Sequence, residues 1–411
     1  MRPPGGEHTV NNHSANRKVL ISGASIAGPA LAYWLDRYGF DVTVVERASA
    51  VRGGGYAIDI RGAAREVVDR MGLLPQLREA HVDTRKLSFV DADGAPIGSV
   101  APETVNGGAA GLDLEVRRGD LASALYAPLR HRVEFLFGDS IATLDDRADR
   151  ADRVDVTFDS GAHRTFDLVI GTDGLHSNTR GLVFGPEDAF HRYLGHVFAG
   201  FTLANDLGLA HEGIIWNTPG RAAVLYAHEP AEHVHGFLVL KREDAPVDAF
   251  RDPQAQRELV AAAFPERGWH IPALVNAMRE ADDLFFDVVS QIHMPTWSRG
   301  RVALAGDAAH ATSFLSGQGS SVSLVGAYLL AGELAGHTDH AAAFAAYERK
   351  ARPFVERNQA LAASGGTALV PGTQDLLDTR NATLRNPTNP AGAEGRAAHN
   401  GVILPDYDHA G

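Results

Sequence analysis

Near its N-terminus the chain alternates between short apolar runs and a helical spacing of apolar residues. Residues 18–22 form an apolar run, and the apolar side chains of residues 26–38 then recur every three or four positions, a period that predicts an amphipathic helix. Gly39 is a residue type that commonly ends helices, and a second apolar run, residues 40–46, follows it. This order predicts two parallel strands joined by a helix, a β-α-β unit.

The turn between the first strand and the helix carries the glycines of a dinucleotide site. Its sequence, Gly23-Ala-Ser25-Ile-Ala-Gly28, has Ser25 where the pattern Gly-x-Gly-x-x-Gly has its second glycine. A small-sided turn lets a pyrophosphate approach the backbone, and the helix that begins there offers free N–H groups. Glu46 ends the second strand, where an acid accepts hydrogen bonds from a ribose. An ordinary strand-to-helix turn is the alternative, but the order of strand, turn, helix, strand and acid favours the dinucleotide site.

Later apolar runs predict a second unit made mainly of antiparallel strands. Strand-like runs dominate residues 192–240, helical spacings follow over residues 252–264 and 272–281, and residues 284–293 return to a strand pattern. We therefore expect residues 185–295 to form a separate, mainly antiparallel domain with helices on one side.

The remaining segments complete the predicted organisation. A hairpin is expected around Asp93-Gly94, and single strands are expected over residues 133–143 and 165–170. Helices are expected over residues 319–334 and 340–357. The chain is thus divided into a disordered leader (residues 1–17), a discontinuous first domain (18–184 and 296–360), the inserted domain (185–295), and a C-terminal segment (361–411) whose tail is loosely attached.

Composition and charge argue against several classes of partner. The chain has 38 basic and 51 acidic residues, a formal net charge of −13, which argues against a nucleic acid or an anionic membrane. It contains no cysteine, so disulfides and thiolate chemistry are excluded. No run of 18 apolar residues is present, so no membrane span is expected, and the polar leader is not a signal peptide. A cytoplasmic location is compatible with these features.

Residue spacing disfavours two other kinds of site. His228, His233 and His235 resemble a metal cluster only by their number, because their spacing does not place them on one face, so no metal is expected. The Gly-x-Ser-x-Gly turn that carries the nucleophile of many hydrolases is absent from the sequence.

Several short motifs together resemble one enzyme family. They are the turn Gly-Ala-Ser-Ile-Ala-Gly-Pro at residues 23–29, the run Asp-Leu-Val-Ile-Gly-Thr-Asp-Gly-Leu-His-Ser-Asn-Thr-Arg at 167–180, Gly-Asp-Ala-Ala-His at 306–310, and Leu-Ser-Gly-Gln-Gly at 315–319. With these motifs the sequence resembles the group A flavoprotein monooxygenases, the para-hydroxybenzoate hydroxylase-like aromatic hydroxylases that include the tetracycline-inactivating enzymes. The resemblance extends from Val19 to about Arg357.

The resemblance implies an α/β fold with FAD as the cofactor. The first domain is expected to be a discontinuous Rossmann-type FAD-binding domain, with an inserted, mainly antiparallel β-sheet substrate domain and C-terminal helices. The glycine turn would line the pyrophosphate, the acid after the second strand the ribose, and the turn at 317–319 the isoalloxazine. The implied FAD-binding residues are Gly23, Ser25, Ile26, Ala27, Gly28, Glu46, Arg47, Arg118, Asp173, Gly306, Asp307, Gly317, Gln318, Gly319 and Ser320.

The flavin would carry out the oxygen chemistry, so no catalytic side chain is assigned. Candidates are Arg61, His310 and Phe314, and Phe314 stands where the family usually has proline. Structural alternatives stay open for five of these residues: Arg61 as an ion-pair partner of Asp59 or Glu46, Arg118 as a surface cation near a helix start, His310 as a structural residue, and Asp173 and Asp307 as stabilisers of their turns. The candidates for lining the substrate site are Asp59, Phe198, Trp216, Tyr226, Phe237 and Phe314.

We therefore predict a FAD- and NAD(P)H-dependent monooxygenase that hydroxylates or epoxidises a phenolic or polycyclic aromatic, natural-product-like substrate with O2, through a flavin C4a-hydroperoxide. A non-redox flavoprotein cyclase is the first alternative, because the phenyl ring of Phe314 would narrow the oxygen pocket. A drug-sequestering flavoprotein is the second. A flavin halogenase is disfavoured because none of the four tryptophans forms a Trp-x-Trp pair.

Overall fold

The structure is a computed structural model. It describes residues 17–51, 53, 55–106, 108, 111–146, 153–227, 232–250, 252–385 and 393–407. The expected disordered leader (apart from residue 17) and His228 lie outside the described residues.

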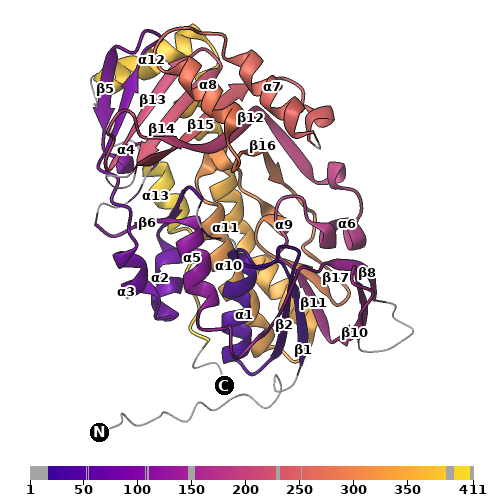
Figure 1. Cartoon of the computed structure of the whole chain (residues 1–411). Helices are drawn as coiled ribbons and strands as arrows, with labels where there is room; N and C mark the ends of the chain where they lie inside the picture. Colours follow the sequence, from indigo (N-terminus) through magenta and orange to yellow (C-terminus); the bar gives the residue numbers. More distant parts are fainter. Residues whose placement is uncertain are drawn as a thin grey trace.

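A six-stranded, mostly parallel sheet forms the centre of the α/β domain (Figure 1). Strand β1 (Lys18–Ser22) lies between β2 (Asp41–Glu46) and β11 (Leu168–Gly171) and runs parallel to both. The outer strands are β7 (Glu134–Phe137) on one side and β18 (Val302–Leu304) and β17 (Ser298–Arg299) on the other. The predicted β-α-β unit is confirmed, with helix α1 (Ala27–Arg37) between β1 and β2.

The two faces of this sheet are covered differently. Val19, Ile21 and Val44 pack into a core with the helices, whereas Leu20 and Val45 pack against a small three-stranded sheet. The helices include α1, α2 (Ala63–Arg70), α5 (Arg118–Tyr126), α10 (Gly319–Gly336) and α11 (His340–Leu369), and the small sheet contains β8 (Ile141–Asp145), β9 (Val154–Phe158) and β10 (His163–Phe166). Every residue of α10 from 321 to 334 is buried, as expected for a helix that is apolar all round.

A seven-stranded sheet forms the second domain, called here the sheet domain. Its order is β16-β12-β15-β14-β13-β4-β5, and all neighbours are antiparallel except β13 and β4. The strands are β4 (Lys86–Val90), β5 (Pro96–Val100), β12 (His191–Ala204), β13 (Glu212–Thr218), β14 (Arg221–Ala227), β15 (His233–Lys241) and β16 (Phe285–Ile292). Helices α7 (Pro253–Ala263) and α8 (Ile271–Glu280) pack on one face, and the α/β domain lies beyond the other (Figure 1). The hairpin around Asp93-Gly94 is present, but it belongs to this sheet although it lies outside residues 185–295.

Short elements connect the two domains. The two-stranded sheet of β3 (Ala57–Ile60) and β6 (Leu114–Arg117) lies at the domain boundary. The remaining elements near this boundary and on the surface are α3 (Leu74–Glu79), α4 (Pro102–Asn106), α6 (Asn178–Phe184), α9 (Asp307–His310) and the 3-10 turns Glu187–Ala189, Val247–Ala249 and Phe314–Ser316. No described helix has both the length and the apolar composition needed to cross a membrane.

Two expected single strands are each divided in the structure. Residues 133–143 contribute β7 to the six-stranded sheet and β8 to the small sheet, because Gly138, with φ of 74°, redirects the chain between them. Residues 165–170 are divided between β10 and β11 at Asp167, whose carboxylate accepts a hydrogen bond from the backbone N–H of Lys18 at 2.6 Å.

The expectation of a loosely attached C-terminal tail is wrong for residues 393–407. Helix α11 continues to Leu369, and α12 (Gln374–Arg385) and α13 (Ala393–His399) follow it. Leu404 is buried, and Pro405 accepts hydrogen bonds from Arg70 at 2.7 Å and Tyr328 at 2.6 Å. These contacts hold the segment against the α/β domain despite its polar composition.

Candidate functional site

The glycine turn lies at the carboxyl end of β1, packed against the turn that follows β11. Gly23 has φ of 106°, and a Cβ atom there would lie 2.7 Å from the carbonyl oxygen of Thr172. A Cβ atom at Gly28 would lie 1.9 Å from the carbonyl oxygen of Gly23. Thr172 Oγ1 donates a hydrogen bond to the carbonyl oxygen of Ser22 at 2.8 Å, which joins the two turns. Ile26 and Ala27, at the start of α1, are buried beneath this turn. The glycines are therefore required by the close approach of the two turns.

Ser25, the residue that departs from the glycine pattern, binds the side chain of Arg118. Arg118 Nη2 donates a hydrogen bond to Ser25 Oγ at 2.7 Å. Arg118 is the first residue of α5, and its backbone N–H donates to the carbonyl oxygen of Tyr56 at 3.1 Å. The serine thus brings a guanidinium group to a turn built for an anion.

Glu46 contacts the same turn from the end of β2. Its carboxylate accepts hydrogen bonds from the backbone N–H groups of Ala24 at 2.8 Å and Ala48 at 2.9 Å. A carboxylate has about four acceptor positions, so acceptor capacity for ribose hydroxyls remains. Arg47, the next residue, is exposed.

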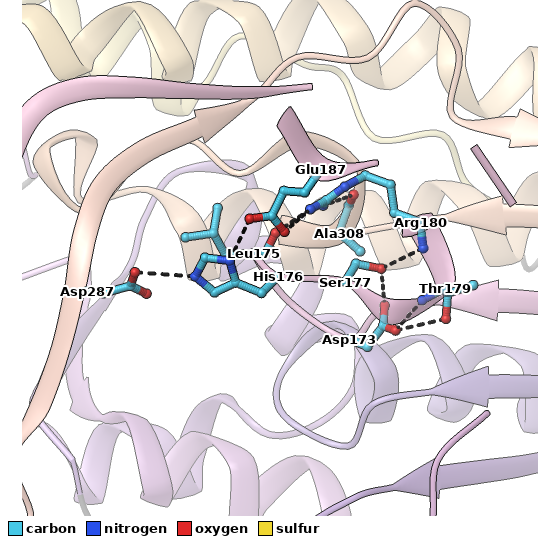
Figure 2. Close-up of polar contacts among 9 residues, drawn as sticks. All are labelled: Asp173, Leu175, His176, Ser177, Thr179, Arg180, Glu187, Asp287 and Ala308. Atoms are coloured by element: carbon cyan, nitrogen blue, oxygen red, sulfur yellow. Dashed lines mark hydrogen bonds and ion pairs between the residues drawn. The ribbon is translucent and has the colours of Figure 1, made fainter. Parts of the chain in front are cut away.

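Asp173 organises the turn between β11 and α6 (Figure 2). Its Oδ2 accepts hydrogen bonds from the backbone N–H and the hydroxyl of Thr179, both at 2.8 Å, and its Oδ1 accepts one from Ser177. These contacts support the alternative in which Asp173 stabilises its turn. A contact with a pyrophosphate stays a prediction.

The side chain of Arg180 connects this turn with the turn at Gly306 and Asp307, called here the Gly-Asp turn, and the sequence analysis assigned it no role. The side chain is fully buried and donates to the carbonyl oxygens of Leu175 at 2.7 Å and Ala308 at 3.0 Å, and to Glu187 at 2.8 Å (Figure 2). Burial lowers the pKa of Arg180, while Glu187 and then Asp173 oppose that shift. Its place in the run Ser-Asn-Thr-Arg at 177–180 was the available signal.

His176 joins the same turn to the sheet domain. Nδ1 lies 2.8 Å from Glu187 Oε1, and Nε2 lies 3.3 Å from Asp287 Oδ1 on β16 (Figure 2). Hydrogen bonds to Asp287 and Glu187, in that order, raise the pKa of His176 to about 10 against the opposing effect of burial. The imidazole is therefore protonated at neutral pH and donates to both acids.

A His176→Gln variant is expected to lose a pH-dependent part of its stability. Because the folded-state pKa, about 10, lies above the ordinary 6.5, the contribution is complete below pH 6.5 and is lost as the pH rises toward 10. The side chain is 51% exposed, so screening limits the contribution to about 1 kcal/mol. Urea unfolding at intervals across this range should show the stability of the wild-type protein falling toward that of the variant. Parallel pH profiles would contradict the assignment.

Asp307 lies between the Gly-Asp turn and the start of α10. A Cβ atom at Gly306 would lie 2.7 Å from Ala27 Cβ, so this turn packs directly on α1. Among the described residues, none donates a hydrogen bond to the Asp307 carboxylate. Burial raises the pKa of Asp307, and the positive charge of Arg118 opposes that shift. A Cβ atom at Gly319 would lie 3.7 Å from Asp307 Oδ1, which brings the α10 N-terminus beside the acid.

The turn at 317–320 contains a buried amide with an unused acceptor. Gln318 is buried, its Nε2 donates to the carbonyl oxygen of Gly317 at 3.1 Å, and its Oε1 has no hydrogen-bond partner among the described residues. Gly319 and Ser320 begin α10, and their backbone N–H groups lie in its first turn. Two glycine turns, an acid available for hydrogen bonding and an unpaired amide oxygen fit a dinucleotide that extends from β1 to α10.

Aromatic rings gather where the sheet domain faces this turn. The ring of Phe314 stacks on Phe198, with centroids 4.7 Å apart and planes 10° apart, and its centroid lies 6.1 Å from that of Phe237. Phe237 in turn contacts Tyr56 edge-to-face at 5.6 Å. We call Tyr56, Phe198, Phe237 and Phe314 the aromatic cluster. Sequence reasoning missed Tyr56, and the signal was an aromatic residue directly after three glycines.

The expectation that Trp216 lines the substrate site is corrected by the structure. Its indole stacks on Trp269 with centroids 6.2 Å apart, and its Nε1 donates to the carbonyl oxygen of Ala92 at 3.1 Å. Trp216 belongs to the core between the seven-stranded sheet and helices α7 and α8. Because side chains alternate along a strand, it points away from the face that carries Phe198 and Phe237.

The structure supports the interpretation of Arg61 as an ion-pair partner and of His310 as a structural residue. Arg61 is buried and forms an ion pair with Asp59. His310 is buried beside Trp297, with its Nε2 3.2 Å from the hydroxyl of Tyr347. Burial lowers the pKa of His310 to about 3, so the ring is neutral. His310 is therefore not placed to exchange protons at neutral pH.

The glycine turn and the Gly-Asp turn lie together at one end of an open, mostly parallel sheet, beneath a second, antiparallel sheet. This arrangement is typical of flavoproteins that have one domain for the dinucleotide and a separate sheet domain for the substrate. A family model described as FAD binding domain matches residues 16–362. The chain therefore belongs to this family and is a FAD-dependent monooxygenase. The family resemblance, the fold class and the FAD cofactor expected from the sequence are confirmed.

Relatives and solved structures agree with this assignment. An uncharacterized protein of Mycobacterium tuberculosis is 46% identical over 349 residues, which cover 84% of this chain and 92% of that protein. A flavin-dependent monooxygenase of Legionella longbeachae is 33% identical, with 96% of this chain and 99% of that protein covered. The crystal structure of tetracycline destructase Tet(55) has a TM-score of 0.83 and 33% identity, and the match covers 96% of this chain and 99% of that chain.

Proposed function

We propose that the protein hydroxylates or epoxidises a phenolic or polycyclic aromatic compound, with NAD(P)H as reductant and O2 as the second substrate. The aromatic cluster carries this proposal. Phe314 lies in the 3-10 turn that leads into residues 317–320, and its ring contacts Phe198 and Phe237. Stacked or edge-to-face contacts with aromatic rings favour planar aromatic ligands. The 33% identity to a tetracycline destructase, whose name specifies a polycyclic compound, supports the same substrate class.

The chain's own residues would bind and orient the reactants. FAD, when bound, supplies the capacity to take up a hydride and to activate oxygen. The glycine turn and Arg118 would hold the pyrophosphate, Glu46 the ribose and Asp307 the ribityl chain. Backbone N–H groups at the start of α10 would stabilise negative charge on the pyrimidine end of the flavin. The aromatic cluster would exclude water from the space between the two domains.

The visible spectrum of the purified protein tests this proposal. We expect a flavin band that bleaches with NADPH in the absence of oxygen and recovers in air, and faster bleaching in the presence of a phenolic or polycyclic ligand. Bound flavin that stays oxidised with every ligand would contradict the monooxygenase proposal. Turnover without NAD(P)H would then identify the cyclase, and tight binding with no product would identify the sequestering protein.

Asp307→Asn and Glu46→Gln variants are expected to retain FAD less well. Each change removes a charged acceptor, and hydrogen bonds to charged groups contribute about 1.5–3 kcal/mol, which corresponds to roughly a tenfold to hundredfold rise in the FAD dissociation constant. Fluorescence titration of the apoprotein with FAD measures the change. Glu258→Gln is a matched control because Glu258 is exposed and pairs with Arg279 on the sheet domain. Unchanged FAD affinity in both site variants would contradict this assignment of the site.

A further inference from the structure

The ring of Phe314 covers two buried rings of the aromatic cluster. It stacks on Phe198 with the two planes 10° apart, and its centroid lies 6.1 Å from that of Phe237. Phe198 and Phe237 are only 5% and 9% exposed, whereas Phe314 is partly exposed. Phe314 is therefore the outer ring of the three, and its departure would expose the aromatic surface that it now covers.

The two covered rings are fixed by the sheet, whereas Phe314 is not part of any strand. Phe198 and Phe237 belong to the neighbouring strands β12 and β15. The ring of Phe237 lies over Gly200, where a Cβ atom would be 3.1 Å from Phe237 Cε1. Phe314 lies in a 3-10 turn of three residues. Its ring can leave the stack without breaking the strand pairing that fixes the other two rings.

The backbone directly before Phe314 is strained. Ser313 has φ of 87° and ψ of 147°, a conformation that is almost restricted to glycine and persists elsewhere only where surrounding contacts impose it. Ser313 Oγ accepts a hydrogen bond from the backbone N–H of Leu315 at 3.2 Å, and its carbonyl oxygen accepts one from the backbone N–H of Ser316 at 3.1 Å. These contacts, together with the stacking of Phe314, hold the turn against the preference of its backbone.

The residues on both sides of this pair are anchored. Thr312 is buried, and its carbonyl oxygen accepts a hydrogen bond from Gln291 Nε2 at 3.1 Å. Leu315 is pressed against α11, because a Cβ atom at Gly365 would lie 1.9 Å from the carbonyl oxygen of Leu315. A change in the turn is therefore confined to Ser313 and Phe314, and the glycine turn at 317–319 keeps its place.

We propose that Phe314 is a specificity-determining residue that occupies the aromatic cluster until a planar aromatic substrate displaces it, an inference that rests on the proposed function. A ligand ring that stacks on Phe198 replaces the contact that Phe314 gives up, whereas a ligand without a ring face does not. The apparent affinity is reduced by the fraction of molecules in which Phe314 still occupies the cluster. Phe314 stands where the family usually has proline, so this internal ring is a feature of the present chain.

The first test measures binding of 2-naphthol, a fused aromatic alcohol, to the FAD-loaded full chain by equilibrium dialysis without NADPH. Phe314→Ala is expected to bind 2-naphthol about tenfold or more tightly than the wild-type protein, because each of the two ring contacts that compete with the ligand is worth about two- to twelvefold. Phe250→Ala is the matched control. Phe250 is also partly buried, but it packs against the core between the seven-stranded sheet and helices α7 and α8, on the opposite face. Its affinity should equal that of the wild-type protein.

Two variants of Ser313 test the role of the strained backbone. Ser313→Gly and Ser313→Ala both remove the hydroxyl that accepts from Leu315, but only glycine adopts a φ of 87° without strain. Ser313→Gly therefore stabilises the occupied turn relative to Ser313→Ala. We expect Ser313→Gly to bind 2-naphthol about fivefold or more weakly than Ser313→Ala does.

The position of the ring can be followed directly by fluorine NMR of a Phe314→4-fluorophenylalanine protein. Without ligand, its signal should differ from that of the same protein unfolded in urea, because the ring is stacked on Phe198. With saturating 2-naphthol, the signal should move toward the unfolded position as the ring leaves the cluster.

Equal or weaker binding of 2-naphthol by Phe314→Ala than by the wild-type protein would overturn the inference, because the ring would then be a fixed wall of the site. Equal affinities of the two Ser313 variants, or no binding by either the wild-type protein or Phe314→Ala, would also overturn it. Binding by Phe314→Ala alone would support it. The bleaching of the flavin by NADPH and its recovery in air, recorded on the same proteins, judge the monooxygenase function separately. Tighter binding by Phe314→Ala without bleaching supports the displacement of the ring and contradicts the function.

Discussion

Replacing Gly28 with alanine is expected to abolish FAD retention and to destabilise the α/β domain. The new Cβ atom would lie 1.9 Å from the carbonyl oxygen of Gly23 and 2.9 Å from Thr172 Oγ1, so helix α1 has to move away from the turn. Overpacking of this kind costs about 1–3 kcal/mol, and displacement of the helix also removes its N–H groups from the phosphate position. We expect an FAD dissociation constant at least about 100-fold higher, equal to roughly 2.7 kcal/mol.

The FAD content after gel filtration and the Tm of the apoprotein measure these two effects separately. Gly181→Ala is the control, because Gly181 lies in helix α6 and a Cβ atom there would have no neighbour within 4 Å. Alanine in an exposed helix is about 0.5–1 kcal/mol more favourable than glycine, so this control should keep its FAD and gain stability. A Gly28→Ala protein with full FAD content would contradict the close packing of the two turns.

The second large effect is expected at Arg180. An Arg180→Met variant would leave the carbonyl oxygens of Leu175 and Ala308 without their donor and Glu187 without its buried partner. Removing one member of a buried ion pair costs about 3–5 kcal/mol, and we expect about 3 kcal/mol because Glu187 is 37% exposed. Urea unfolding measures this loss in the free energy of unfolding.

An exposed ion pair provides the comparison for Arg180. Arg279 and Glu258 are 44% and 55% exposed, and such a pair contributes about 0–1 kcal/mol, so Arg279→Met should have little effect. Equal losses in the free energy of unfolding of Arg180→Met and Arg279→Met would contradict the role of Arg180 in connecting the Gly-Asp turn with the turn between β11 and α6.

The part of the fold that could be predicted from the sequence depends on local signals. The β-α-β unit is contained within residues 18–46, and its strand periods, glycine turn and terminal acid are all readable in order. The contact between Ser25 and Arg118 is different, because it joins residues 93 positions apart. Nothing in either local sequence indicates that the serine hydroxyl binds the guanidinium. Tyr56 differs from this pair, because its place after three glycines was a local signal, but its contact with Phe237 joins distant parts of the chain and is not readable from that signal.

The error at Trp216 has a physical origin in the sheet domain. Helices α7 and α8 cover one face of this sheet and the α/β domain lies beyond the other, so both faces carry apolar residues. Alternation along a strand then separates the residues into two sets without indicating which set faces the flavin. Phe198 and Trp216 belong to opposite sets although both are large, aromatic and buried. The missing information is the packing of the helices, which is a tertiary property.

The hairpin β4–β5 has a consequence for any attempt to divide the protein. Because the hairpin is inserted between β3 and β6 of the chain, the polypeptide leaves the α/β domain twice to build one seven-stranded sheet. A recombinant fragment of residues 185–295 would lack β4, which pairs with one side of β13. That side of β13 would become a free edge, which favours aggregation. Much of the pairing in this sheet also joins distant segments, a topology that folds slowly. The two domains are therefore expected to unfold as one cooperative unit and to resist excision by limited proteolysis.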